Sequence, residues 1–169
     1  MAGVVDDQAR FAYLAEGNAK QARKRVAADV IVRNRDGHIL LVNPTYKPYW
    51  DLPGGMAEAN ESPRDAARRE LCEELDLRID VGRLLVLDWV SPTGPWDDLL
   101  HFIFDGGVLS EQAAQPRIAD GEISEWAMCT VEEAVRRLRR DIAQRLLRAL
   151  AALDTDSIDY GENFGAAVE

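Results

Sequence analysis

The alternation of hydrophobic and polar positions predicts a series of β-strands. Two aliphatic, β-branched runs, at 26–32 and 38–42, flank the polar residues 34–37. The Asp36-Gly37 pair inside that polar loop is a strong hairpin signal, so the two runs are predicted to pair as neighbouring strands. The chain has further stretches typical of extended structure, at 49–52, 81–90, 99–104 and 123–129. A turn-rich loop, Ser91-Pro92-Thr93-Gly94-Pro95, joins the second of these stretches to the third.

Helical spacing of apolar residues predicts a short helix over 6–22 and a second helix after residue 62. Ser62 is a good N-cap for the second helix, and Pro63 suits the first helical position. Asp65 occupies the place from which a capping-box acid reaches back to the N-cap. This helix is expected to end near Asp76.

A third helical region begins at Thr130, which is an N-cap candidate with Glu133 three residues later. The helical pattern continues from Arg140 to Leu153. The tail that follows is acidic and contains glycine, and it is expected to be loosely ordered. Strands in hairpins with helices between and after them favour an α/β fold, in which helices cover a mixed β-sheet.

Charge and composition narrow the class of partner. The chain of 169 residues carries a net charge of −10, which argues against a protein that holds long nucleic acid through a basic face. A small phosphorylated substrate remains compatible, because a metal ion can supply positive charge locally. No apolar run approaches the roughly 20 residues that cross a bilayer, and residues 1–7 lack the pattern of a secretory signal. Cys72 and Cys129 lie far apart and have no metal-ligand spacing, so we expect a cytoplasmic protein without a membrane partner.

One segment, residues 54–77, concentrates groups that can carry chemistry. Gly54-Gly55 permits backbone conformations closed to other residues and lets the chain approach a ligand closely. At 100° per residue, the side chains of Glu70, Glu73 and Glu74 fall within a single arc of about 100° on the following helix. Like charges at this spacing repel one another, so the arc makes physical sense if a hard divalent cation lies against it.

The choice of ion follows from the ligand type. Magnesium and manganese prefer oxygen ligands, and the arc offers neither His nor Cys, which disfavours zinc. The alternative is a solvated acidic helix face with Leu71 and Leu75 turned inward. The two glycines just upstream of the helix favour the metal site.

The segment resembles the Nudix signature, Gly-x5-Glu-x7-Arg-Glu-U-x-Glu-Glu-x-Gly-U, where U is a bulky aliphatic residue. Eight positions fall in register: Gly55, Glu61, Arg69, Glu70, Leu71, Glu73, Glu74 and Leu77. One position departs, because Asp76 stands where the family usually has glycine. That position often needs a left-handed backbone, which Asp tolerates at a cost of about 1 kcal/mol relative to glycine. The departure therefore concerns stability rather than metal binding.

The resemblance implies a Nudix-type α/β/α sandwich with a mixed β-sheet. It covers residues 24–152, which leaves an N-terminal helical extension at 1–23 and an acidic C-terminal tail at 153–169. It also implies a site in which the Gly55 carbonyl and three glutamates bind Mg²⁺, with Mn²⁺ as the alternative; those glutamates are Glu70, Glu73 and Glu74. Glu61 and Arg69 would orient the metal-binding carboxylates without touching the substrate.

The activity implied by the resemblance is hydrolysis of a diphosphate bond in a small nucleotide-like substrate by an activated water. Family members differ in the general base, and two candidates remain open: Glu70, and Glu122 in a glycine-containing loop. The substrate is either a nucleoside diphosphate derivative, including nucleoside triphosphates, or specifically ADP-ribose or a nucleotide sugar. A ligand-sensing module without catalysis is the alternative of another class, but such modules commonly lose signature glutamates that this chain keeps.

Substrate recognition is less constrained. Among the aromatic residues that can stack on a base, Trp50 and Trp96 are the preferred candidates, the latter because it lies in a polar turn. Arg33 and Lys47 are candidates for contact with phosphate or ribose. Pro92, fifteen positions beyond the signature, is a weak pointer to ADP-ribose hydrolases. Because family members are often dimers, a homodimer is a candidate assembly.

Overall fold

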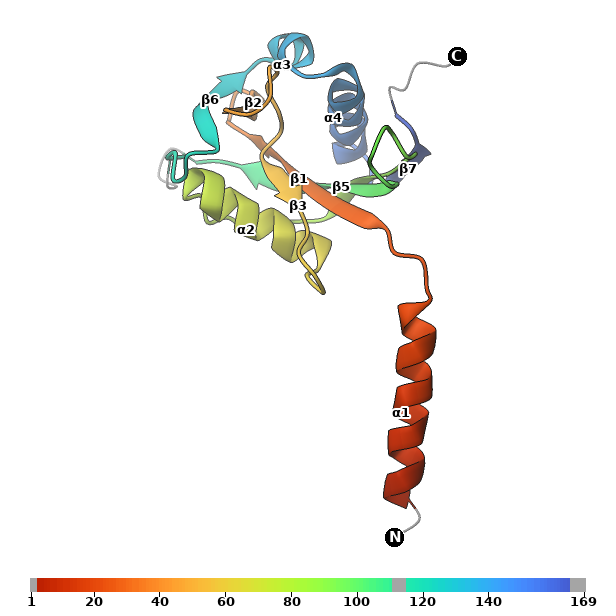
Figure 1. The fold of residues 1–169 in the computed structure, drawn as a ribbon. Helices are drawn as coiled ribbons and strands as arrows, with labels where there is room; N and C mark the ends of the chain where they lie inside the picture. The colour runs from red at the N-terminus through yellow and green to blue at the C-terminus, as the bar shows by residue number, and fades with distance from the viewer. Residues whose placement is uncertain (1–2, 111–114, 165–169) are drawn as a thin grey trace.

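The computed structural model describes residues 3–110 and 115–164, in which a mixed sheet is covered by helices on both faces (Figure 1). The helices are α1 (Gly3–Ala19), α2 (Pro63–Leu75), α3 (Val131–Arg137) and α4 (Arg140–Leu153). The strands are β1 (Arg25–Arg33), β2 (Ile39–Pro44), β3 (Gly54–Met56), β4 (Leu84–Val90), β5 (Leu99–Val108), β6 (Ile123–Cys129) and β7 (Asp159–Glu162).

The sheet runs in the order β6-β2-β1-β5-β4-β7, and β3 pairs with β1 outside this path. The pairs β1–β5 and β4–β7 are parallel, and the other pairs are antiparallel. Strand β1 therefore lies at the centre, with β5 beside it and the short β3 alongside its first half, where Ala28 is opposite Gly55. This pairing fixes the glycine bend against the middle of the sheet.

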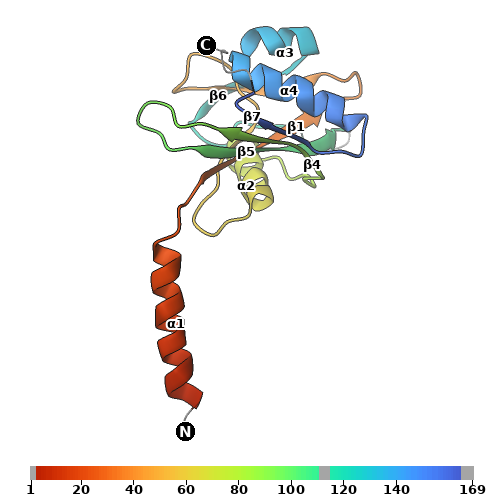
Figure 2. The same cartoon turned by 90° about the vertical axis from the view of Figure 1, so that its right-hand side faces the viewer.

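Alternation along the central strands creates two hydrophobic cores, one for each face of the sheet. Val30 and Val32 pack with Leu71 and Leu75 of α2 on one face. Ile31 packs on the opposite face, against residues of α3 and α4. Figure 2 shows the resulting layers, with α2 on one side of the sheet and α3 and α4 on the other. The predicted α/β/α sandwich with a mixed sheet is confirmed.

Local signals predicted several elements correctly. The hairpin forms as expected: Gly37 adopts φ +79° and the Asn34 N–H donates to the His38 carbonyl oxygen. Ser62 caps α2 by accepting a hydrogen bond from the Asp65 N–H, and Asp76 ends the helix in the left-handed conformation, at φ 48° and ψ 31°. The latter confirms that Asp replaces the glycine of the signature without a change of backbone.

Three expectations about local structure were wrong. Residues 49–52 form only isolated bridges, and the strand lies instead at β3, on the glycines themselves. The helical region after Thr130 is broken at Leu138, whose extended backbone separates α3 from α4. The tail is not loosely ordered over its described part, because β7 pairs with β4 and Phe164 packs against the core under α4.

Helix α1 projects away from the sandwich (Figures 1 and 2). Its large apolar side chains Phe11, Tyr13 and Leu14 are exposed. Among the described residues, α1 and the other helices are all too short or too polar to cross a membrane.

Candidate active site

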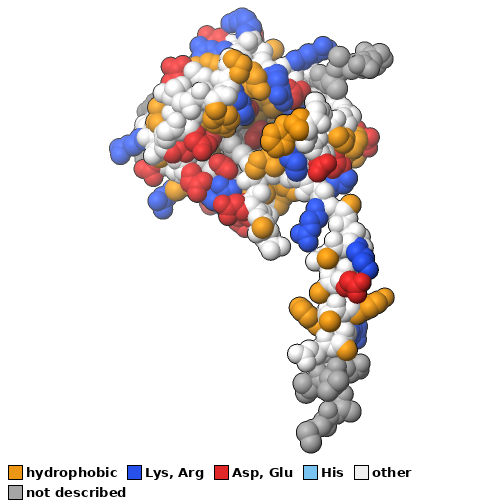
Figure 3. All heavy atoms as spheres, viewed as in Figure 1, with side chains coloured by type: hydrophobic (Ala, Val, Ile, Leu, Met, Phe, Trp, Pro, Cys, Tyr) orange, Lys and Arg blue, Asp and Glu red, His pale blue; other side chains and the backbone are white. Residues whose placement is uncertain are grey.

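A cleft of about 570 Å³ opens beside the glycine bend of β3. The bend and α2 form one end of its lining, with Gly54, Gly55, Glu70 and Glu74. The loop after β2, the first half of β1 and the start of α4 contribute further lining, together with Trp96, Leu99, His101 and Glu122. Acidic side chains gather near α2 on the face seen in Figure 3. The cleft thus begins at the acidic signature segment and extends along the sheet toward α4.

Both glycines are required for the close approach of β3 to α2. Gly54 adopts φ +143°, and a Cβ there would overlap the carbonyl oxygen of Ala28. A Cβ on Gly55 would lie 2.5 Å from Oε1 of Glu70, so the carboxylate occupies the space that a side chain would take. The Gly54 N–H donates a hydrogen bond of 3.2 Å to Oε2 of Glu74. The bend therefore seats two carboxylates directly against the backbone.

Burial raises the pKa of both carboxylates. Glu74 is only 5% exposed, and burial raises its pKa to about 8, partly opposed by the Gly54 N–H and reinforced by the charge of Glu70. Burial also raises the pKa of Glu70, and the hydrogen bond from Arg69 opposes that rise. Two acids held together in low-dielectric surroundings favour either a proton or a cation between them.

Arg69 organises the other signature acids. Its guanidinium donates two hydrogen bonds to Glu61, at 2.9 and 3.0 Å, and one to the Met56 carbonyl oxygen at 3.0 Å. The Nη1 atom donates to Glu70 and to Glu73, each at 2.9 Å. Glu61 and Arg69 therefore hold the loop after β3 and the Glu70 carboxylate in place. The Glu73 side chain is 54% exposed and is not among the residues that line the cleft.

The donor set can be compared with the needs of magnesium. Within residues 3–110 and 115–164, no three His, Cys, Asp or Glu side chains are already grouped closely enough to hold a metal ion. Glu70 and Glu74 nevertheless flank the Gly54-Gly55 backbone, and within the described residues Glu74 forms no ion pair with a cationic side chain. Magnesium usually takes one or two carboxylates and fills its other positions with water and phosphate oxygens. These residues fit that ion.

The floor of the cleft contains polar residues that sequence reasoning missed. His101 Nε2 lies 2.6 Å from Asp29 Oδ2, and both side chains are buried. Lys47 donates a 2.7 Å hydrogen bond to Asp51, whose pKa is raised by burial and by the charge of Asp29. A signal for Asp29 was present, because it interrupts the apolar run at 26–32 with a charge. His101 carried no such signal, since only the pairing of β1 with β5 brings it to Asp29.

The predicted substrate residues, taken together with the candidate base Glu122, divide into two groups. Lys47, Trp96 and Glu122 line the cleft, and Trp96 is 61% exposed with the Arg25 guanidinium stacked 4.7 Å from its ring centroid. Arg33 and Trp50 are not among the lining residues.

Arg33 and Trp50 lie away from this cleft, for a structural reason in each case. Arg33 lies at the far end of β1, where it pairs with Asp105 at 2.9 Å. Trp50 packs against the core under α4, with Arg137 stacked 4.7 Å from its ring centroid.

Removal of divalent metal should make stability depend on pH through Glu74. Its folded pKa of about 8 lies above the ordinary 4.5, so the folded state binds more protons than the unfolded state between these values. The stabilising contribution of Glu74 protonation is then fully present below about pH 4.5 and is lost as pH rises through 8. We expect a loss on the order of 1–4 kcal/mol, measured by urea unfolding in EDTA from pH 5 to pH 9. Glu74→Gln should lack this component, and identical pH profiles for the two proteins would contradict the assignment.

Comparisons with known proteins agree with this geometry. The model of the NUDIX domain family matches residues 23–152. A MutT-like protein of Streptomyces ambofaciens is 39% identical over 123 residues, which are 73% of this chain and 74% of the relative.

Among solved structures, the MutT protein of Methanosarcina mazei superposes with a TM-score of 0.66 at 20% identity, covering 80% of this chain and all of that one. The NUDIX domain of Shewanella oneidensis NrtR, complexed with ADP ribose, also gives a TM-score of 0.66 at 20% identity, covering 82% of this chain and 97% of the other. At these identities the likeness concerns the fold. The family match, covering most of the chain including the glycine bend and the acidic helix, shows that this protein belongs to the Nudix family and is a Nudix hydrolase acting on phosphoric anhydride bonds.

Proposed function

We propose that the protein hydrolyses a diphosphate bond in a nucleoside diphosphate derivative or nucleoside triphosphate, with Mg²⁺ as cofactor. The observation that carries the proposal is the pair of carboxylates, the buried Glu74 and the partly buried Glu70, seated against the Gly54-Gly55 backbone at one end of a cleft. Such a pair of acids in a cleft, with pKa values raised by burial, is characteristic of a functional site.

Glu70, Glu74 and the Gly55 carbonyl would hold the magnesium ion, with Glu73 joining them if its carboxylate leaves Arg69. Bound Mg²⁺ would neutralise the diphosphate oxygens and make a water molecule more acidic. Arg69, fixed by Glu61, keeps the Glu70 carboxylate oriented toward the bend. Lys47 and Trp96 line the same cleft, where an ammonium group can meet phosphate and an indole can stack on a base.

The base that accepts the water proton has two candidates. Glu122 is exposed and lines the cleft from the loop before β6, where the Asp120 carboxylate accepts a hydrogen bond from its N–H. Glu70 is fixed by Arg69 and by its contact with Gly55. We assign the proton transfer to Glu122, because its exposed carboxylate forms no hydrogen bond or ion pair within the described part of the chain and can approach a water molecule freely.

Glu122→Gln should therefore lower kcat by about 10²-fold or more, in the range typical of a lost general base, with little change in KM. Steady-state kinetics at saturating magnesium measures kcat and KM for both proteins. If the variant keeps its rate, Glu70 becomes the base.

A second candidate function is hydrolysis of ADP-ribose or a nucleotide sugar. The solved NUDIX domain of Shewanella oneidensis NrtR is described as complexed with ADP ribose, and it shares the fold of this chain. The cleft also has an exposed indole, Trp96, that can stack on the nucleobase that each of these substrates carries. A ligand-sensing module without turnover is the remaining alternative.

A substrate screen with magnesium separates these functions. Nucleoside triphosphates, ADP-ribose, nucleotide sugars and dinucleoside polyphosphates would each be incubated with the protein, and phosphate would be read with and without added phosphatase. Turnover of triphosphates alone would discard the ADP-ribose function. Glu74→Gln protein is the matched control for contaminating phosphatases. Binding of a nucleotide without turnover of any substrate would favour the sensing module.

A further inference from the structure

The cleft continues into a second chamber that the C-terminal segment helps to build. This chamber, of about 680 Å³, shares Arg139, Arg145 and Trp96 with the first cleft and is lined in addition by Asn163 and Phe164. Residues 153–164 lie beyond the region that the family model matches. The tail was expected to be loosely ordered. Instead, its residues Asn163 and Phe164 form part of the wall of this second chamber.

The tail segment 159–164, here called the strap, is held firmly against β4. Beyond the β7–β4 pairing, the Asn163 N–H donates to the Trp89 carbonyl oxygen and the Asn163 side chain accepts from the Ser91 N–H, each at 2.8 Å. The Phe164 ring packs over Gly161, where a Cβ would overlap the ring. The strap is thus locked by its backbone and by one aromatic side chain.

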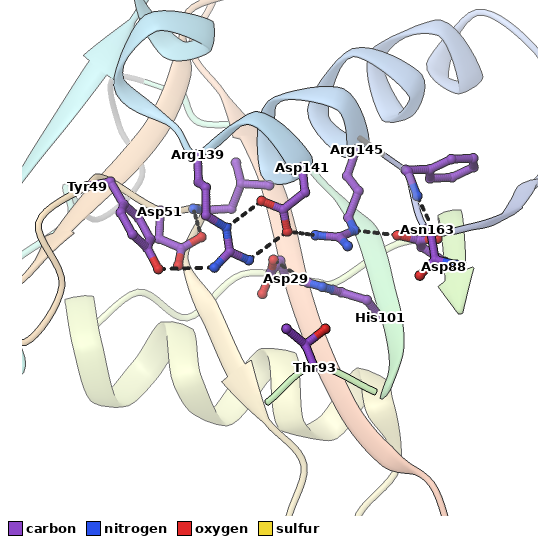
Figure 4. A network of polar contacts seen from close by, with 12 residues as sticks. Asp29, Tyr49, Asp51, Asp88, Thr93, His101, Arg139, Asp141, Arg145 and Asn163 are labelled. Carbon is purple, nitrogen blue, oxygen red and sulfur yellow. Dashed lines mark hydrogen bonds and ion pairs between the residues drawn. The ribbon is translucent and has the colours of Figure 1, made fainter. Parts of the chain in front are cut away.

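A chain of buried polar contacts connects the strap to the cleft (Figure 4). The Phe164 N–H donates to Asp88, and Asp88 accepts a 2.7 Å hydrogen bond from Arg145. Arg145 in turn donates to Asp141 at 3.0 Å, and Arg139 donates to the same carboxylate from Nη2 at 2.6 Å. This chain of contacts, from Phe164 through Asp88, Arg145 and Asp141 to Arg139, is here called the relay. Asp88 and Arg145 are almost fully buried, so separating their charges would cost considerable free energy.

Arg139 is the end of this relay that reaches the cleft. Its side chain is 53% exposed, lies in the break between α3 and α4, and lines both chambers. The Nε and Nη2 atoms donate to Asp141, and Nη1 donates to the Tyr49 hydroxyl at 3.1 Å. A guanidinium has five N–H groups, so one on each Nη atom remains for a ligand. Arginine held in this way is suited to binding phosphate.

We propose that the strap positions Arg139 through this relay, and that Arg139 binds a phosphate group of the substrate on the wall of the cleft. The proposal rests on the diphosphate substrate of the proposed function. Arg139 is the binding residue, and Asp88, Asp141 and Arg145 are positioning residues. The alternative is that the relay only stabilises the packing of α4 on the sheet. In that case a change in the strap would not alter substrate affinity.

The test is a double-mutant cycle between Arg139→Ala and Gly161→Ala. The second change displaces the Phe164 ring and loosens the strap without altering any side chain of the relay. Affinity is measured calorimetrically with magnesium for two probes whose only phosphorus–phosphorus linkage is a P–C–P bridge that resists hydrolysis, methylenediphosphonate and α,β-methylene-ADP. Thermal unfolding of every variant establishes that it is folded. Asp141→Asn, which leaves the strap intact, tests the relay from its other side if Gly161→Ala fails to fold.

We expect Arg139→Ala to weaken binding of at least one probe by about tenfold or more, as the loss of a hydrogen bond to a charged group predicts. Gly161→Ala should weaken the same probe, and the double variant should resemble Arg139→Ala alone. Arg139→Lys should restore affinity in part. Arg136→Ala, an exposed charge outside the cleft, and Gly17→Ala, with no neighbour within 4 Å of a new Cβ, are the matched controls and should bind as wild type.

Additive effects, an unchanged affinity in Arg139→Ala, or failure of wild-type protein to bind either probe would overturn the proposal. Because the probes are not cleaved, this result is separate from that of the substrate screen. Binding that depends on Arg139 without turnover of any substrate would reject the proposed hydrolysis and keep the relay. Turnover of a substrate, together with probe binding that does not change in Arg139→Ala, would support the proposed hydrolysis and reject the role of Arg139 and the relay.

Discussion

Glu74→Gln is expected to lower kcat by at least about 10²–10³-fold, the range found when one charged or dipolar group of a preorganised site is removed. Glutamine has nearly the same shape and its amide oxygen can still accept the Gly54 N–H, so the fold should persist. The change removes the more deeply buried of the two negative charges on which magnesium binding is proposed to depend. Steady-state kinetics over a range of magnesium concentrations measures the effect.

The same variant should separate metal binding from folding. Without metal at pH 8, Glu74→Gln should be at least as stable as wild type, because the variant lacks the buried carboxylate, with a pKa of about 8, that is partly ionised in wild type at this pH. Magnesium should raise the unfolding temperature of wild type and leave that of the variant almost unchanged. A variant that is inactive but still stabilised by magnesium to the same extent would contradict the assignment of Glu74 as a metal ligand.

Two further glutamates serve as comparisons for this experiment. Glu132, an exposed residue of α3, is the control for removal of one surface charge, and Glu132→Gln should have no effect. Glu73 was predicted to bind metal, but its carboxylate is bound by Arg69 outside the lining of the cleft. Glu73→Gln is therefore expected to reduce kcat less than Glu74→Gln. Equal losses would indicate that Glu73 leaves Arg69 when metal binds.

Gly55→Ala is expected to abolish most activity while leaving the protein folded. The new methyl group would lie 2.5 Å from Oε1 of Glu70, and the end of this side chain can rotate away without displacement of backbone. The metal site would then lose one carboxylate from its seat against the bend. We expect kcat to fall by about 10²-fold or more, since misplacement by about 1 Å has effects of this size, with a small change in unfolding temperature.

Gly54→Ala is the contrasting variant for that prediction. Its Cβ would overlap the backbone carbonyl of Ala28, and its φ of +143° is closed to alanine, so both folding and activity should be lost. Circular dichroism and thermal unfolding distinguish the two outcomes. If Gly55→Ala retains full activity, the contact between Gly55 and Glu70 has no part in metal binding.

How much of this site could be predicted depends on the distance along the chain between its parts. Gly55, Glu61, Arg69, Glu70 and Glu74 lie within one bend and one helix, where spacing alone determines which side chains share a face. The caps of the helices were predictable for the same reason, because a cap is decided by a few neighbouring residues. The break at Leu138 was not, since it is stabilised by a bridge to Trp50 across the fold.

By itself, the sequence determined the family, the α/β/α architecture and the local order of the acidic helix, because these follow from short-range periodicity and a contiguous motif. Only the tertiary structure decided which residues outside the motif reach the cleft. It placed Arg33 at the far end of its strand, brought His101 to Asp29, and made the tail a wall joined to Arg139. These outcomes depend on strand pairing and packing between segments more than fifty residues apart, and no local pattern of hydrophobic and polar positions specifies such contacts.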